Sequence, residues 1–150
     1  MKEARVSAET RVLLIAAPFY EDITEQLVAG AKGACESAGV NAEVVEVPGA
    51  LEIPAVIALA EQGKSPYDAY VALGCVIRGE TSHFDYVCGE SARGLMDLTL
   101  KGVPVGNGIL TVENIKQARV RANVDEKNKG GDAANAALAL LDLKRKFGAA

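Results

Sequence analysis

The only histidine of this 150-residue chain, His83, lies where an apolar stretch meets a helical pattern. The uncharged run Tyr70–Ile77 has the length and composition of a strand buried on both faces. From His83 onward, apolar residues recur at intervals of three, four and seven, which predicts a helix. The short polar loop Arg78–Ser82 joins the two segments. Because an imidazole changes its charge near pH 7, a histidine at this junction is suited to proton transfer.

Polar and aromatic residues also follow the other predicted strands. Phe19 follows the first strand, Pro48–Glu52 the second, Arg78–His83 the third and Asn107–Glu113 the fourth. In α/β sheets, ligands bind beyond the carboxyl ends of the strands, where helix N-termini present unpaired backbone N–H groups. We therefore expect these four segments to lie on one rim of the sheet.

Each candidate residue also has an interpretation without chemistry. Phe19 fits a core position, and Glu52 fits a first helical turn, where a carboxylate stabilises the helix dipole by roughly 0.3–1 kcal/mol. His83 fits a helix start or a packed position, and Arg121 and Lys129 fit a solvated face. The residue types alone leave both interpretations open, and the choice depends on whether these residues share one site.

The elements that must position these residues alternate along the chain. The predicted strands are Arg11–Ala17, Glu43–Val47, Tyr70–Ile77 and Val103–Leu110. The predicted helices run through Leu27–Cys35 to a stop near Gly39, then Leu51–Gln62, Phe84–Leu100, a short helix from the capping-box-like Thr111–Asn114 through Arg119, and Asp132–Phe147. Such alternation predicts one α/β domain over residues 1–150, a flavodoxin-like α/β/α sandwich with a four-stranded parallel sheet covered on both faces. Residues 1–10 are expected to form a flexible arm or an edge strand.

Composition excludes several classes of function. The net charge is −4 with interleaved signs, so no nucleic-acid surface is expected. The apolar run Val12–Ala17 is too short for a membrane span or an export signal. The three cysteines, Cys35, Cys75 and Cys88, form no CxxC pair and fit reduced thiols in a cytoplasmic protein. One histidine and scattered cysteines give no metal-ligand spacing, so no metal is expected.

The last predicted helix is apolar almost all round over Ala133–Leu141. A helix without a polar face is normally buried on more than one side. In a small single domain, this indicates an interface between subunits.

Several long motifs resemble the lumazine synthase family, in order and with compatible spacing over essentially the whole chain. They are Val47–Pro54 (VPGALEIP), Leu73–Cys88 (LGCVIRGETSHFDYVC), Thr111–Asn114 (TVEN) and Asn128–Gly130 (NKG). The resemblance implies the penultimate step of riboflavin biosynthesis, without cofactor or metal. In that step 5-amino-6-(D-ribitylamino)uracil condenses with 3,4-dihydroxy-2-butanone 4-phosphate, giving 6,7-dimethyl-8-ribityllumazine, phosphate and water.

The resemblance also implies which residues would bind the pyrimidine substrate. Phe19 would stack on the pyrimidine ring. The wall around the ribityl chain would be formed by Ala50, Leu51 and Glu52, with the Glu52 carboxylate accepting hydroxyl hydrogens. Backbone groups at the strand end would meet the pyrimidine edge, at Cys75, Val76 and Ile77.

On the phosphate side, the resemblance implies backbone N–H donors at Glu80 and Thr81, with Arg121 as the clamp. His83 would shuttle protons during Schiff-base formation and phosphate loss. Lys129 would support the charged end of the site. Asn107 matches a position that the family supplies from a neighbouring subunit.

The chain also departs from the family pattern. Many members carry an aromatic residue where Asn107 stands, and Tyr20 replaces a commoner asparagine. Asn123–Lys127 lacks the glycine-rich GxKxG segment that is typical of sixty-subunit shells, so we expect a homopentamer. Riboflavin synthase is the partner expected from the same pathway. The alternative is a pentamer that binds a flavin or ribityl compound without turnover, but ring binding alone requires neither a proton shuttle nor a phosphate clamp.

Overall fold

Four parallel strands form one sheet in the order β2-β1-β3-β4. They are β1 (Arg11–Ala16), β2 (Asn41–Glu46), β3 (Ala69–Ile77) and β4 (Val105–Val112). The structure is a computed structural model that describes residues 9–149, so the prediction for residues 1–10 lies almost wholly outside it. β1 and β3 are the two central strands, as their uninterrupted apolar sequences predict.

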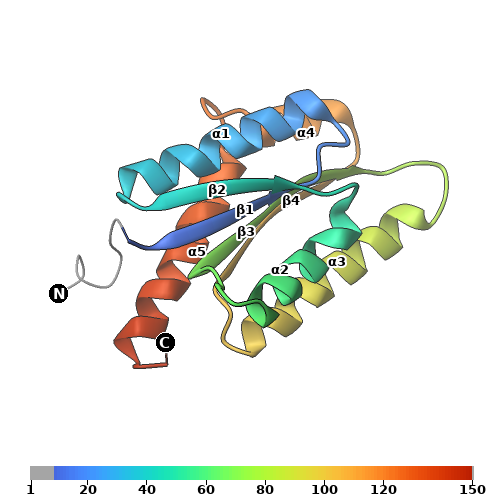
Figure 1. Cartoon of the computed structure of the whole chain (residues 1–150). Helices are drawn as coiled ribbons and strands as arrows, with labels where there is room; N and C mark the ends of the chain where they lie inside the picture. Colours follow the sequence, from blue (N-terminus) through green and yellow to red (C-terminus); the bar gives the residue numbers. More distant parts are fainter. Residues whose placement is uncertain (1–8, 150) are drawn as a thin grey trace.

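Helices cover the sheet on both sides (Figure 1). One face carries α1 (Glu21–Ser37), α4 (Ile115–Ala122) and α5 (Lys129–Lys146). The other carries the 3₁₀ turn η1 (Ala50–Glu52), α2 (Ile53–Gln62) and α3 (His83–Leu100). The predicted three-layer α/β/α sandwich is confirmed, and the strand order follows the flavodoxin-like pattern.

The two faces of the sheet have separate hydrophobic cores. On the α1/α5 side, Leu14 and Val71 are fully buried with Leu27 of α1 and with Ala134 and Ala137 of α5. On the α2/α3 side, Ile15 and Tyr70 are fully buried with Ile57. Because side chains alternate along a strand, β1 and β3 supply both cores at once, which requires their uninterrupted apolar sequence.

β2 departs from the prediction of a sheet covered on both faces. It is an edge strand, and Val44 and Val45 are 37% and 38% exposed in the single chain. Its acidic residues Glu43 and Glu46 are exposed as well. The prediction of full cover was therefore wrong for β2 within one chain.

Two asparagines determine where the last helices begin. Asn114 accepts a hydrogen bond from the Gln117 backbone N–H at 2.9 Å and begins α4, close to the predicted start. Asn128 adopts a left-handed conformation (φ 46°) and accepts from the Gly131 N–H at 3.3 Å. As a result α5 begins at Lys129, three residues earlier than predicted, because the polar NKG segment is the helix start.

Glycine allows α5 to approach α1 closely. A Cβ atom on Gly130 would lie 2.1 Å from the carbonyl oxygen of Leu27 on α1. At the end of α1, Gly39 has φ 71°, which confirms the predicted C-terminal glycine. Among the helices of residues 9–149, none combines the length and hydrophobicity that crossing a membrane requires.

Candidate active site

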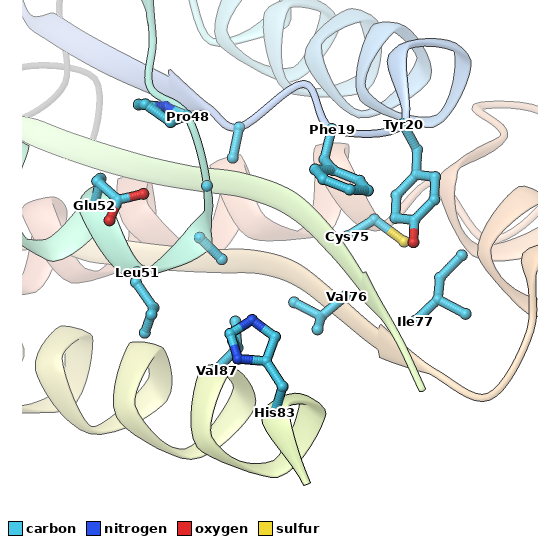
Figure 2. A pocket seen from close by; sticks show the side chains of 13 residues that line it. Phe19, Tyr20, Pro48, Leu51, Glu52, Cys75, Val76, Ile77, His83 and Val87 are labelled. Atoms are coloured by element: carbon cyan, nitrogen blue, oxygen red, sulfur yellow. The ribbon is translucent and has the colours of Figure 1, made fainter. Parts of the chain in front are cut away.

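A cavity of about 340 Å³ opens at the carboxyl rim of the sheet (Figure 2). Its walls come from the link between β1 and α1, the turn η1, the end of β3 and the start of α3. Of the predicted site residues, it brings together those expected around the pyrimidine, the ribityl chain and the proton shuttle: Phe19, Ala50, Leu51, Glu52, Cys75, Val76, Ile77 and His83. The segments after β1, β2 and β3 thus meet at one rim, as the topology predicts.

Phe19 presents an aromatic face to this cavity. Its side chain is 74% exposed, so the interpretation of Phe19 as a core residue is wrong. The ring packs edge-to-face with Tyr20, with centroids 4.9 Å apart and planes at 67°. Tyr20 lines the same cavity and packs against the core under α1. A half-buried neighbour therefore supports the exposed ring, an arrangement suited to stacking on a flat heterocycle.

His83 is the first residue of α3, and its ring points toward the cavity (Figure 2). The side chain is exposed, so the interpretation of His83 as a packed residue is also wrong. Its backbone N–H donates to the Thr81 hydroxyl oxygen at 3.3 Å. Ser82, the N-cap, makes no side-chain cap hydrogen bond. Glu80 and Thr81 lie in the exposed loop just before the helix and are not among the residues lining the cavity.

The turn η1 forms the wall opposite α3. Ala50 is buried, whereas Leu51 and Glu52 are exposed at the cavity. The Glu52 carboxylate makes no cap hydrogen bond with α2, although Glu52 occupies the N-cap position of that helix. It is therefore placed both to favour the helix dipole and to accept hydrogen bonds from a ligand, so both interpretations of Glu52 stand.

The end of β3 forms the floor of the cavity. Cys75 is buried, and burial together with the charge of Asp22 raises the pKa of its thiol to about 11. The thiol is therefore protonated at neutral pH, and Cys75 acts as a small apolar residue there. Val76 and Ile77 are half-buried beside it. This floor is mostly apolar and suits the face of a ring.

The remaining predicted site residues lie elsewhere. Asn107, Arg121 and Lys129 line a second cavity of about 430 Å³, against β4 and α5. The Arg121 guanidinium donates to the Gln117 carbonyl oxygen at 3.1 Å, and the Lys129 ammonium lies 3.7 Å from Asp132. Among residues 9–149, none lines both cavities. Within one chain, the predicted site is thus divided into two parts.

Arg78 forms a charged cluster that sequence reasoning missed. Its Nε donates to both carboxylate oxygens of Glu113, at 2.9 and 3.1 Å, which raises the pKa of the guanidinium. Asp85 lies 3.5 Å away, and the guanidinium carbon lies 4.4 Å from the centroid of the Phe84 ring. The position of Arg78 and Glu113 just beyond two neighbouring parallel strands was the available signal.

Fold and site together define a flavodoxin-like α/β protein with a small-molecule cavity at the carboxyl rim of its sheet. Comparison with known proteins identifies the family within this class. The model of the 6,7-dimethyl-8-ribityllumazine synthase family matches residues 9–145. This chain belongs to that family of enzymes, as the motifs indicate, and the catalytic interpretation is favoured over binding without turnover.

Individual relatives are similar over nearly their whole length. A 6,7-dimethyl-8-ribityllumazine synthase from Novosphingobium aromaticivorans is 59% identical over 137 residues, 91% of this chain and 98% of the relative. The protein of the same name from Bartonella tribocorum is 56% identical over 149 residues, 99% of this chain and 97% of the relative. That from Zymomonas mobilis is 57% identical, with 91% and 98% covered.

Proposed function

We propose that this chain condenses 5-amino-6-(D-ribitylamino)uracil with 3,4-dihydroxy-2-butanone 4-phosphate, yielding 6,7-dimethyl-8-ribityllumazine in riboflavin biosynthesis. One observation carries the proposal. An exposed aromatic ring, Phe19, and the chain's single histidine, His83, line the same rim cavity, which is otherwise mainly apolar. This pairing suits a reaction that binds a flat heterocycle and transfers protons beside it.

The pyrimidine substrate would occupy the first cavity. Its ring would stack on Phe19, and its polar edge would meet backbone groups of Cys75–Ile77. The ribityl chain would extend along η1, where the Glu52 carboxylate accepts hydrogen bonds from its hydroxyl groups.

The phosphate of the second substrate would bind at the start of α3. Backbone N–H groups of Glu80 and Thr81 would meet it at the positive end of the helix dipole. His83, the first residue of α3, would move protons as the Schiff base forms and as phosphate leaves. No cofactor is required, because the condensation and the elimination involve only proton transfer and the departure of water and phosphate.

We further propose that each complete site is shared between two copies of the chain. Asn107 matches a position that the family supplies from a neighbouring subunit. Arg121 and Lys129 line the same cavity as Asn107, so a neighbour that supplies one would supply all three. The Arg121 guanidinium would then clamp the phosphate, with its planar fork facing the oxygens, and Lys129 would add positive charge.

The proposed assembly is a homopentamer. The outer face of α5 exposes small and apolar residues, among them Ala136, Ala139, Leu140 and Leu143, and this surface supports a contact between subunits. The loop before Asn128 has no glycine and exposes Asp125 and Glu126, which would repel symmetry mates at a shell axis. Sedimentation at neutral pH tests this proposal, since a species near five chains supports it and one near a megadalton overturns it.

The activity itself is tested by incubating the purified chain with both substrates and following the absorbance of the lumazine product. Reactions that lack either substrate serve as controls. Product and phosphate in equal amounts support the proposal, and product at the uncatalysed rate overturns it. We expect the cytoplasm as the compartment and riboflavin synthase as the enzyme that uses the product.

A further inference from the structure

Arg78 connects two loops at the carboxyl rim. It directly follows β3, and its backbone N–H donates to the Val112 carbonyl oxygen at 2.9 Å, extending the pairing of β3 with β4. Its Nε donates to both oxygens of Glu113, the residue that follows β4. The loop before α3 and the turn before α4 are thereby joined by side chains as well as by backbone.

The same guanidinium also contacts the first turn of α3. Its Nη1 lies 3.5 Å from an Asp85 carboxylate oxygen, and its central carbon lies over the Phe84 ring, 4.4 Å from the ring centroid. A single exposed ion pair contributes little, but here one cation combines two carboxylates, an aromatic face and the backbone. The loop 79–82, which lies between Arg78 and α3, is therefore anchored at both of its ends.

Arg78 also offsets negative charge on and beside this loop. Glu80, Asp85 and Glu113 are all exposed carboxylates on or beside it. Within residues 9–149, the ion pairs of Asp85 and Glu113 are made with Arg78 alone. Without that cation, an approaching phosphate dianion would meet unbalanced negative charge, and short-range repulsion of this kind is only partly screened by salt.

We propose that Arg78 is a positioning residue for the phosphate-bearing substrate. By bridging Glu113 and Asp85 it fixes the loop 79–82 and neutralises the carboxylates that flank it, without itself contacting the phosphate. The proposal rests on the proposed function, in which this loop binds the phosphate. Arg78 is not among the site residues expected from the sequence.

Steady-state kinetics of Arg78→Gln test the proposal, with Arg93→Gln as the matched control. Arg93 lies further along α3 and also bridges two carboxylates, Glu90 at 2.7 Å and Asp97 at 3.4 Å. We expect Arg78→Gln to raise KM for the butanone phosphate about tenfold, with kcat and the pyrimidine KM changed less than about twofold. Arg93→Gln leaves all three unchanged. Equal changes in both KM values for Arg78→Gln would overturn the proposal.

Two further variants distinguish positioning from a general loss of structure. Arg78→Lys keeps the charge, so its KM for the butanone phosphate should lie between those of the wild type and Arg78→Gln. The double variant Arg78→Gln/Glu113→Gln removes the carboxylate together with the cation, and should recover part of the lost affinity. The single variant Glu113→Gln is measured as well. The proposal is contradicted if the fold-increase in KM for the butanone phosphate in the double variant equals the product of the increases in Arg78→Gln and Glu113→Gln.

Amide hydrogen exchange supplies a measurement that does not depend on turnover. In Arg78→Gln, the amides of residues 79–82 should exchange several-fold faster than in the wild type, and in Arg93→Gln they should not. Unchanged exchange in Arg78→Gln overturns the proposal. An inactive wild-type chain would instead overturn the proposed function, and the exchange measurement would still decide the role of Arg78.

Discussion

At the scale of single residues, different side chains of the first cavity serve the proposed ring binding and the proposed proton transfer. Phe19 offers a ring face, and its neighbour Tyr20 supports it from the side of the core. His83 supplies the imidazole in the lining of this cavity, beside a protonated Cys75 and the side chain of Glu52. The proposed proton transfers therefore depend on His83, whereas the proposed ring binding does not.

His83→Ala should lower kcat while leaving KM for the pyrimidine nearly unchanged. General acid–base groups contribute about 10²–10⁴-fold, and we expect the lower end because the uncatalysed condensation is itself feasible. Tyr86→Phe is the control, since Tyr86 lies on the same helix, is 69% exposed and does not line the cavity. An unchanged kcat in His83→Ala would remove His83 from the mechanism.

Arg121→Ala should raise KM for the butanone phosphate more than KM for the pyrimidine. A charge-assisted contact is worth roughly 1.5–3 kcal/mol, or about 10–100-fold in affinity. Arg119→Ala is the matched control on the same helix, because Arg119 is exposed, pairs with Asp22 at 3.7 Å and lines neither cavity. Equal effects of Arg121→Ala on both substrates would show that Arg121 supports the whole pocket.

Cys75 gives a prediction for alkaline pH. Burial raises the pKa of its thiol from its ordinary value of 9.0 to about 11, so the folded state disfavours the thiolate. This stabilisation is complete below pH 9 and is lost as the pH rises toward 11, at up to about 1.4 kcal/mol per pH unit. Urea unfolding at several alkaline pH values should therefore show a steeper decline for the wild type than for Cys75→Ala. Parallel declines would contradict this.

At the scale of elements, strands and long helices could be predicted from sequence because the spacing of their apolar residues matches the faces that they bury. The apolar run of β3 and the glycine after α1 led to correct assignments. The start of α5 was missed, since a polar segment with two glycines resembles a loop until Asn128 is seen to cap it. The cover of β2 was mispredicted because strand order, not composition, makes it an edge.

Of the candidate site, only the part that follows from the topology of the sheet was predictable. The ends of parallel strands meet at one rim, which correctly grouped Phe19, Glu52 and His83. The second cavity lies against β4 and α5 and is separate from the first. Spacing along the chain does not indicate on which side of β4 Arg121 lies. The contacts of Arg78 depend on the register between β3 and β4, and the uninterrupted apolar run of β3 shows no alternation from which that register could be read.

The packing of α5 on α1 should be sensitive to one methyl group. In Gly130→Ala, the new Cβ would overlap the backbone of Leu27, so we expect a loss of about 3 kcal/mol or more in unfolding free energy. Gly33→Ala is the control on α1, where the added Cβ has no neighbour within 4 Å. Removing a glycine from a helix interior should stabilise by roughly 0.5–1 kcal/mol. Chemical denaturation measures both, and similar values for the two variants would contradict the close approach.

At the scale of the whole molecule, the separation of the two cavities is the reason to propose that one chain alone does not form a complete site. One holds the proposed ring-binding and proton-transfer groups, and the other holds the proposed phosphate clamp. The central claim is that a site forms only where the first cavity of one copy meets the second cavity of another. In a closed ring, every interface has one of each, so all sites would be complete.

Subunit complementation tests this claim most directly. His83→Ala and Arg121→Ala are denatured, mixed in equal amounts and refolded together, and activity is assayed with the butanone phosphate far below its KM in Arg121→Ala, where each variant alone is strongly impaired. If the two groups come from different copies, random mixing gives one intact site in four, and activity should recover to about a quarter of the wild type. If both groups serve the site of a single chain, no mixed assembly contains an intact site, and the mixture would remain as inactive as its components.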